Sequence, residues 1–126
     1  MYLKCNMIIN FYNKFVNKEK MDFNNFFTPA DEKHVKREKQ KAKDLRKSQW
    51  WKNRLGEGKC HYCECRFHPK ELTMDHVTPI IRGGSTNKNN CVPCCKECNS
   101  QKKYLLPIEW SEYLQKLKKD ASDKLN

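Results

Sequence analysis

The chain has 126 residues, enough for one compact domain with flanking helices, and so small a domain often needs a bound metal to supplement its core. A formal net charge of +11 predicts a polyanionic partner. Nucleic acid comes before an anionic membrane surface, because no amphipathic stripe of Leu, Trp and Phe supports membrane docking. We see no secretory signal and no membrane-spanning run, and therefore expect a cytoplasmic, intracellular protein. In that reducing compartment, paired cysteines bind metal more often than they form disulfides.

The first 58 residues are predicted to form a leader and a basic helix. Residues 1–30 are rich in Asn, Lys and Phe, and we expect a poorly ordered leader. Residues 31–58 are predicted to form one helix, with Asp31 as its N-cap and two glycines ending it. Between positions 32 and 54, ten Lys or Arg residues stand against three acids, a net charge of +7. The basic side chains either form a solvent-exposed face of the helix or bind the phosphates of a nucleic acid.

Residues 59–106 are predicted to form the core of an α+β domain. The expected elements are a strand at 72–77, a flexible glycine loop at 82–85, a strand at 90–93 and a helix from 95 to about 103. Residues 107–126 follow with apolar side chains at helical spacing, which predicts a C-terminal helix with a polar tail after Lys118.

Two Cys-x-x-Cys pairs in this core predict a structural zinc site. Four thiolates suit tetrahedral zinc, and such a closed site stabilises a fold without doing chemistry itself. Cys65 and Cys94 each lie beside one of the pairs and are alternative ligands. The predicted ligands are Cys60, Cys63, Cys95 and Cys98.

Asp75 and His76 lie between the two cysteine pairs and suggest a reactive centre. Asp and Asn side chains are oxygen ligands that suit Mg²⁺ or Mn²⁺, and Asn99 directly follows the last zinc cysteine. Neutral histidine can take a proton from water near pH 7. Neighbours on a strand point to opposite faces, so both side chains reach one site only where the strand ends and bends. Pro79, three residues after His76, predicts such an end.

The order and spacing of these residues resemble the HNH endonucleases. The resemblance covers about residues 59–106, and Cys60-x-x-Cys63 is similar to the knuckle of the zinc-containing branch. Asn99 stands where the family name has its final His, which makes this an HNN variant. The residues that carry the resemblance are Met74-Asp75-His76-Val77-x-Pro79, then Arg82-Gly83-Gly84, then Asn90-x-Val92-Pro93-x-Cys95-x-x-Cys98-Asn99-x-x-Lys102.

The resemblance implies a small ββα-metal core with structural zinc, flanked by N- and C-terminal helices. It implies that His76 is the general base that activates water for attack on a phosphodiester. Asp75 and Asn99 would hold the catalytic Mg²⁺ or Mn²⁺. Asn90 would orient His76 and brace the loop. Together these roles describe an enzyme, a metal-dependent endonuclease that hydrolyses DNA.

Three cations of the same region are predicted to contact nucleic acid. The resemblance implies that Lys102 contacts a backbone phosphate. Lys103 lies beside it, and Arg82 is expected to touch phosphate from its loop. The two lysines also suit the negative end of the helix dipole. The alternative to an enzyme is a zinc-stabilised nucleic-acid-binding module without turnover. A weaker alternative is a protein–protein adaptor that exposes its three tryptophans, which we expect instead in the core.

Overall fold

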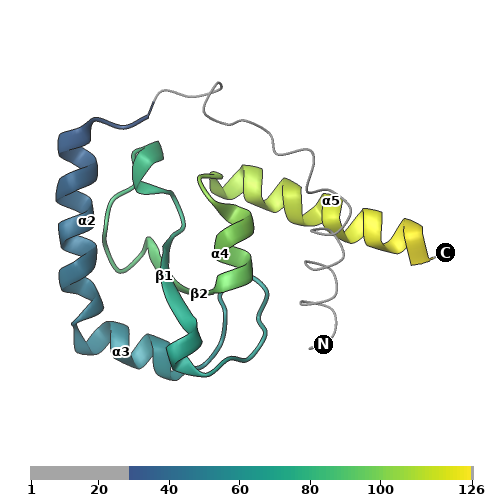
Figure 1. Ribbon diagram of the computed structural model, residues 1–126, viewed down its shortest axis with the longest axis horizontal. Coiled ribbons are helices and arrows are strands. Elements are labelled where there is room, and N and C mark those ends of the chain that lie inside the picture. The colour runs from purple at the N-terminus through teal and green to yellow at the C-terminus, as the bar shows by residue number, and fades with distance from the viewer. Residues whose placement is uncertain (1–28, 126) are drawn as a thin grey trace.

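The computed structural model describes residues 29–125, so the leader expected at 1–30 lies almost entirely outside the described residues. The described part of the chain is an α+β fold with two strands and four α-helices. In chain order the elements are α2 (Glu32–Arg46), α3 (Gln49–Gly56), the 3-10 turn η2 (Pro69–Glu71), β1 (Leu72–His76), the 3-10 turn η3 (Ile80–Arg82), β2 (Cys91–Cys95), α4 (Lys96–Lys102) and α5 (Pro107–Leu125) (Figure 1).

The two strands form an antiparallel hairpin whose register places Met74 opposite Pro93. β2 leads directly into α4, because the Cys95 side chain caps that helix by accepting a hydrogen bond from the Cys98 amide. α4 lies beside the hairpin and completes a ββα unit (Figure 1). The predicted fold class, two strands followed by a helix, is confirmed. The second strand covers 91–95 rather than 90–93, an ordinary difference at strand ends.

The basic segment forms two helices rather than the single helix predicted for 31–58. Asp31 does cap the first helix, since its side chain accepts a backbone amide of the first turn. The chain turns at Ser48, whose hydroxyl donates to the Leu45 carbonyl at 2.6 Å and accepts from the Trp51 amide at 3.2 Å. One serine thus satisfies backbone groups at the end of α2 and at the start of α3. Helix propensity alone does not reveal this break between the two helices.

The hydrophobic core includes the hairpin, the knuckle before it and α5. Trp110 is 3% exposed, and its ring meets Tyr62 edge-on and stacks on Tyr113. Trp51 is also buried, so these two tryptophans lie in the core, which removes the patch that the adaptor alternative needs. α5 continues beyond Lys118, where the sequence predicted a tail. None of the described helices combines the length and the apolar character needed to cross a membrane.

Two glycines define the path of the chain after β1, where the sequence predicted a glycine loop. Gly83 has φ of +93°, a left-handed conformation that ends η3. A Cβ at Gly84 would lie 1.8 Å from the carbonyl oxygen of Thr78, so a side chain at this position would force the two segments apart. The turn is therefore tightly packed, and it sets where residues 84–86 lie.

Candidate metal centre and reactive histidine

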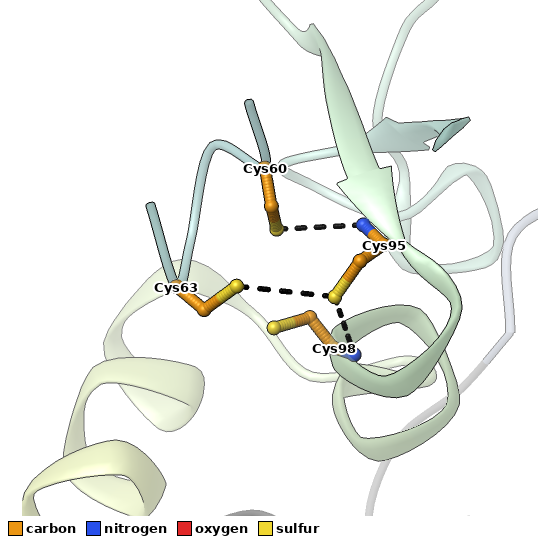
Figure 2. Close-up of side chains that lie close together, drawn as sticks. All are labelled: Cys60, Cys63, Cys95 and Cys98. Carbon is orange, nitrogen blue, oxygen red and sulfur yellow. Dashed lines mark hydrogen bonds between the residues drawn. The ribbon is translucent and has the colours of Figure 1, made fainter. Parts of the chain in front are cut away.

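Four cysteine sulfurs converge where the knuckle before β1 meets the start of α4. The four Sγ atoms lie within 4.8 Å of one another, and those of Cys63 and Cys95 are 3.9 Å apart. Zn–S bonds of about 2.3 Å in a tetrahedron separate the sulfurs by about 3.8 Å, so this donor set fits one zinc ion. Figure 2 shows the side chains gathered around a common centre: Cys60, Cys63, Cys95 and Cys98.

Backbone amides and neighbouring thiols control the charge of this cluster. The Cys95 amide donates to Cys60 Sγ and the Cys98 amide donates to Cys95 Sγ, each at 3.4 Å. Hydrogen bonds from the other thiols, Cys63 first, lower the pKa of Cys60, whereas the contact with Cys60 raises the pKa of Cys98. One thiolate forms readily, but four mutually repelling thiolates need a cation, a charge that a metal ion such as zinc would supply.

The alternative ligands lie outside this cluster. Cys94 is fully buried, and its thiol donates to the Cys95 carbonyl at 3.3 Å. Cys65 is not part of the converging group either. Within residues 29–125, the four-cysteine cluster is the only place where ligand atoms of three or more His, Cys, Asp or Glu residues come together.

His76 ends β1 and faces the segment that follows the glycine turn. Its Nε2 lies 2.8 Å from Thr86 Oγ1. The single hydroxyl proton of Thr86 is donated to the Glu38 carbonyl at 2.8 Å, so Thr86 Oγ1 accepts from His76 Nε2–H. That tautomer leaves Nδ1 as the basic nitrogen. Burial lowers the pKa of His76 below its ordinary value of 6.5, although Asp75 opposes the shift, so the ring is neutral near pH 7.

Asp75 makes its contacts on the side of β1 that faces α4. Lys102 Nζ lies 3.1 Å from Asp75 Oδ2, and the same oxygen accepts the Tyr62 hydroxyl proton at 2.5 Å. Asp75 is 7% exposed and Lys102 is 0% exposed, so the ion pair is shielded from water. The hydrogen bonds of Asp75 and His76 therefore run in different directions, one toward α4 and one toward Thr86.

Comparison with known protein families identifies the region that contains these features. Residues 60–104 match the family model described as HNH endonuclease. This segment is an HNH domain. It includes the cysteine cluster, both strands and α4, whereas α2, α3 and α5 lie outside it. A search of curated proteins found no match. The family assignment indicates a nuclease or nucleic-acid-binding function.

Asn90 of the HNH domain braces the loop that carries the partner of His76. Its Oδ1 accepts from the Thr78 amide at 2.8 Å, and its Nδ2 donates to the carbonyls of Thr78 at 3.0 Å and Ser85 at 2.7 Å. These bonds join the two ends of the glycine turn. The His76 ring itself bonds Thr86, the residue after Ser85, so the bonds of Asn90 reach the loop next to the residue that contacts His76.

Asn99 and Lys102 lie one turn apart on α4 and meet successive positions on one face of β1. Asn99 Nδ2 donates to Thr73 Oγ1 at 3.4 Å, while Lys102 reaches Asp75. The carboxylate of Asp75 and the amide oxygen of Asn99 suit a hard divalent cation by their chemistry. The ammonium group of Lys102 is the charge with which such a cation would compete for Asp75.

Two of the three residues predicted to contact nucleic acid have other partners. Lys102 is fully buried, so it does not present its charge to a phosphate. Arg82 binds Glu109 at 2.9 Å and the Tyr104 carbonyl at 3.1 Å, which ties η3 to α5. The sequence did not indicate these partners, because spacing along a chain does not show which acid a cation will meet in the fold. Lys103 is exposed, and its contact with nucleic acid stays a prediction.

Sequence reasoning missed three residues of the site. Thr86 holds the His76 ring, Glu38 holds Thr86, and Tyr62 donates to Asp75. Glu38 had a detectable signal, since it is one of three acids among ten cations in the basic segment. Thr86 and Tyr62 had none, because a single Thr in a loop or Tyr in a knuckle is ordinary.

Proposed function

We propose that this chain is a metal-dependent endonuclease that hydrolyses phosphodiester bonds in DNA. His76 acts as the general base, and its Nδ1 takes a proton from the water molecule that attacks phosphorus. The observation that carries this proposal is the bond between His76 Nε2 and Thr86, which engages Nε2–H and leaves Nδ1 as the basic nitrogen. The HNH assignment of residues 60–104 supports the reaction class.

The proposed enzyme uses two kinds of metal site. The four cysteines would hold a structural zinc that joins the knuckle to β2 and α4. Asp75 and Asn99 would hold Mg²⁺ or Mn²⁺, whose charge offsets the negative charge that develops on the phosphate. Lys102 occupies Oδ2 of Asp75, so a cation bound at that oxygen would compete with this ion pair.

Duplex DNA would bind the basic helices mainly through its phosphates. The net charge of +7 between positions 32 and 54 favours backbone contacts with little base selectivity. We therefore expect affinity to fall steeply as salt rises, because bound cations release counterions from the DNA. An affinity that stays flat between low and physiological salt would exclude this electrostatic contribution.

Cleavage of supercoiled plasmid tests the proposed reaction. Zinc-saturated protein is incubated with Mg²⁺, with Mn²⁺ or with neither, beside His76→Ala and the control His61→Ala. His61 is exposed, so the control removes an imidazole outside the proposed centre. We expect cleavage that needs a divalent cation, is lost in His76→Ala and is retained in His61→Ala. Equal cleavage by wild type and His76→Ala would show that His76 is not the base.

A zinc-stabilised nucleic-acid-binding module without turnover is the second candidate. The buried pair of Lys102 with Asp75 favours it, because the proposed metal ligand is already neutralised. Tight, salt-sensitive DNA binding by zinc-loaded protein, with no cleavage under either divalent cation, would select this candidate over the enzyme.

A further inference from the structure

α2 contacts the segment after the glycine turn at two points, one helical turn apart. His34 Nε2 lies 3.0 Å from the Gly84 carbonyl, and Arg37 donates to His34 Nδ1 at 3.2 Å, so the Nε2–H of His34 is the donor to Gly84. Four residues later, Glu38 Oε1 accepts the Thr86 amide proton at 2.8 Å. Four helical residues rise about 6 Å and two extended residues about 6.6 Å, so the helix and the loop match in spacing.

Thr86 links α2 to the imidazole of His76, because it forms hydrogen bonds with both Glu38 and His76. Its amide bonds the Glu38 carboxylate and its hydroxyl donates to the Glu38 backbone carbonyl, both at 2.8 Å. The hydroxyl proton is thereby committed, and Thr86 Oγ1 remains as an acceptor for His76 Nε2–H. A continuous set of hydrogen bonds therefore runs from α2 to the ring of His76.

Glu38 is a buried carboxylate on a helix whose other charged side chains are mostly exposed. It is 1% exposed, and its Oε2 binds Lys41 at 3.1 Å and Arg37 at 3.4 Å. The Thr86 amide, followed by Lys41, holds the pKa of Glu38 at about 2. Burying a carboxylate is unfavourable unless it is paired and hydrogen-bonded, so these contacts keep Glu38 ionised at the interface with the loop.

Given the proposed nuclease function, we infer that Glu38 and Thr86 are positioning residues of the active site. They hold the His76 ring in one orientation and keep its proton on Nε2, so that Nδ1 faces the reaction as the base. Neither residue touches the reacting atoms. α2 is then a functional part of the nuclease, although it precedes the matched segment 60–104.

The tautomer of His76 tests this inference without any need for cleavage. Two-bond ¹H–¹⁵N NMR spectra of the zinc-saturated full chain, recorded where His76 is neutral, report which ring nitrogen carries the proton. His76→Ala assigns the signals. Thr86→Val removes the hydroxyl at nearly constant shape, whereas Thr86→Ser keeps it. We expect the Nε2–H form in wild type and Thr86→Ser and a mixture in Thr86→Val. An unchanged tautomer in Thr86→Val overturns the inference.

Single-turnover cleavage with Mg²⁺ or Mn²⁺ gives the functional readout. Thr86→Val and Glu38→Ala should slow cleavage by about 10–100-fold, which is the typical cost of losing a residue that holds a reactive side chain in place. DNA affinity should be unchanged. Thr86→Ser should restore the rate. Glu32→Ala removes the same charge from an exposed position of α2 and should cut like wild type. If Glu38→Ala lowers the fraction of folded protein, the comparison of Thr86→Val with Thr86→Ser decides the test without it.

The two experiments separate the two ideas. A wild type that never cleaves refutes the proposed function, while the NMR spectra still decide whether Thr86 positions His76. A wild type that cleaves, beside a Thr86→Val variant of equal rate, refutes the positioning role and leaves the nuclease intact.

Discussion

Lys102 and Asp75 form a buried ion pair between α4 and β1. Lys102 Nζ lies 3.1 Å from Asp75 Oδ2, and the two side chains are 0% and 8% exposed. Lys102 also donates to the His76 carbonyl at 3.0 Å, and it lies 5.7 Å from the centre of the Tyr62 ring. The pair therefore joins the helix of the HNH domain to the end of its first strand, beside the proposed general base.

Lys102→Met should destabilise the protein, because it leaves Asp75 buried without its cation. Removing one partner of a buried pair typically lowers the free energy of unfolding by about 3–5 kcal/mol. Lys103→Met, a change at the exposed neighbour, should cost less than about 0.5 kcal/mol. Denaturant unfolding of zinc-saturated proteins measures both values. Similar losses in the two variants would show that the ion pair contributes nothing specific.

The same variant tests whether Asp75 holds a divalent cation. With the competing ammonium removed, Mg²⁺ or Mn²⁺ should restore part of the stability lost in Lys102→Met, because a ligand that binds only the folded state stabilises it. The matched control is Lys102→Met with Asp75→Asn, in which no ion-dependent recovery is expected. Recovery of equal size in both proteins would exclude Asp75 as the ligand.

Cys98→Ser should abolish zinc binding and folding together. The binding energy of structural zinc is folding energy, about 10–16 kcal/mol in zinc-finger peptides. Cys91→Ala is the matched control, since Cys91 is fully buried but lies outside the cluster, and it should retain one zinc with a loss of about 1 kcal/mol. Metal analysis and circular dichroism give the two readouts. A folded Cys98→Ser protein that keeps its zinc would contradict the assigned ligands.

Gly84→Ala should disturb the loop that carries Thr86. The added Cβ would lie 1.8 Å from the Thr78 carbonyl oxygen, and we expect a loss of about 1–3 kcal/mol from the overpacking. Gly56→Ala meets no atom within 4 Å and should be neutral or stabilising by up to about 1 kcal/mol. Thermal unfolding compares them. Equal shifts in both variants would mean that the turn tolerates a side chain.

The cleavage rate should decline as pH falls, with a midpoint more acidic than that of an ordinary histidine. The base has to be unprotonated, and burial, followed by the nearby charges of Arg46 and Lys102, lowers the pKa of His76 below 6.5 against the opposing effect of Asp75. Protonation therefore begins at a more acidic pH than for a free histidine. Single-turnover rates across this range locate the decline. A midpoint above 6.5 would exclude a buried, neutral His76 as the base.

The four-cysteine cluster and the order of strands and helix could be predicted because their signals are local. Two Cys-x-x-Cys spacings place pairs of sulfurs on tight turns, and the structure brings all four within 4.8 Å. Alternating side chains with Pro and Gly punctuation predicted the hairpin. The break at Ser48 escaped prediction, because serine ends a helix only when its hydroxyl finds particular backbone partners.

The sequence by itself determined which chemical groups the domain carries, whereas only the tertiary structure decided which of them meet. The family resemblance implied that Lys102 contacts a phosphate, yet the packing of α4 on β1 buries it against Asp75. Glu38 belongs to a helix expected to be solvated, yet it binds Thr86, 48 residues away. Spacing and propensity act over a few residues, while such pairs depend on how whole elements pack.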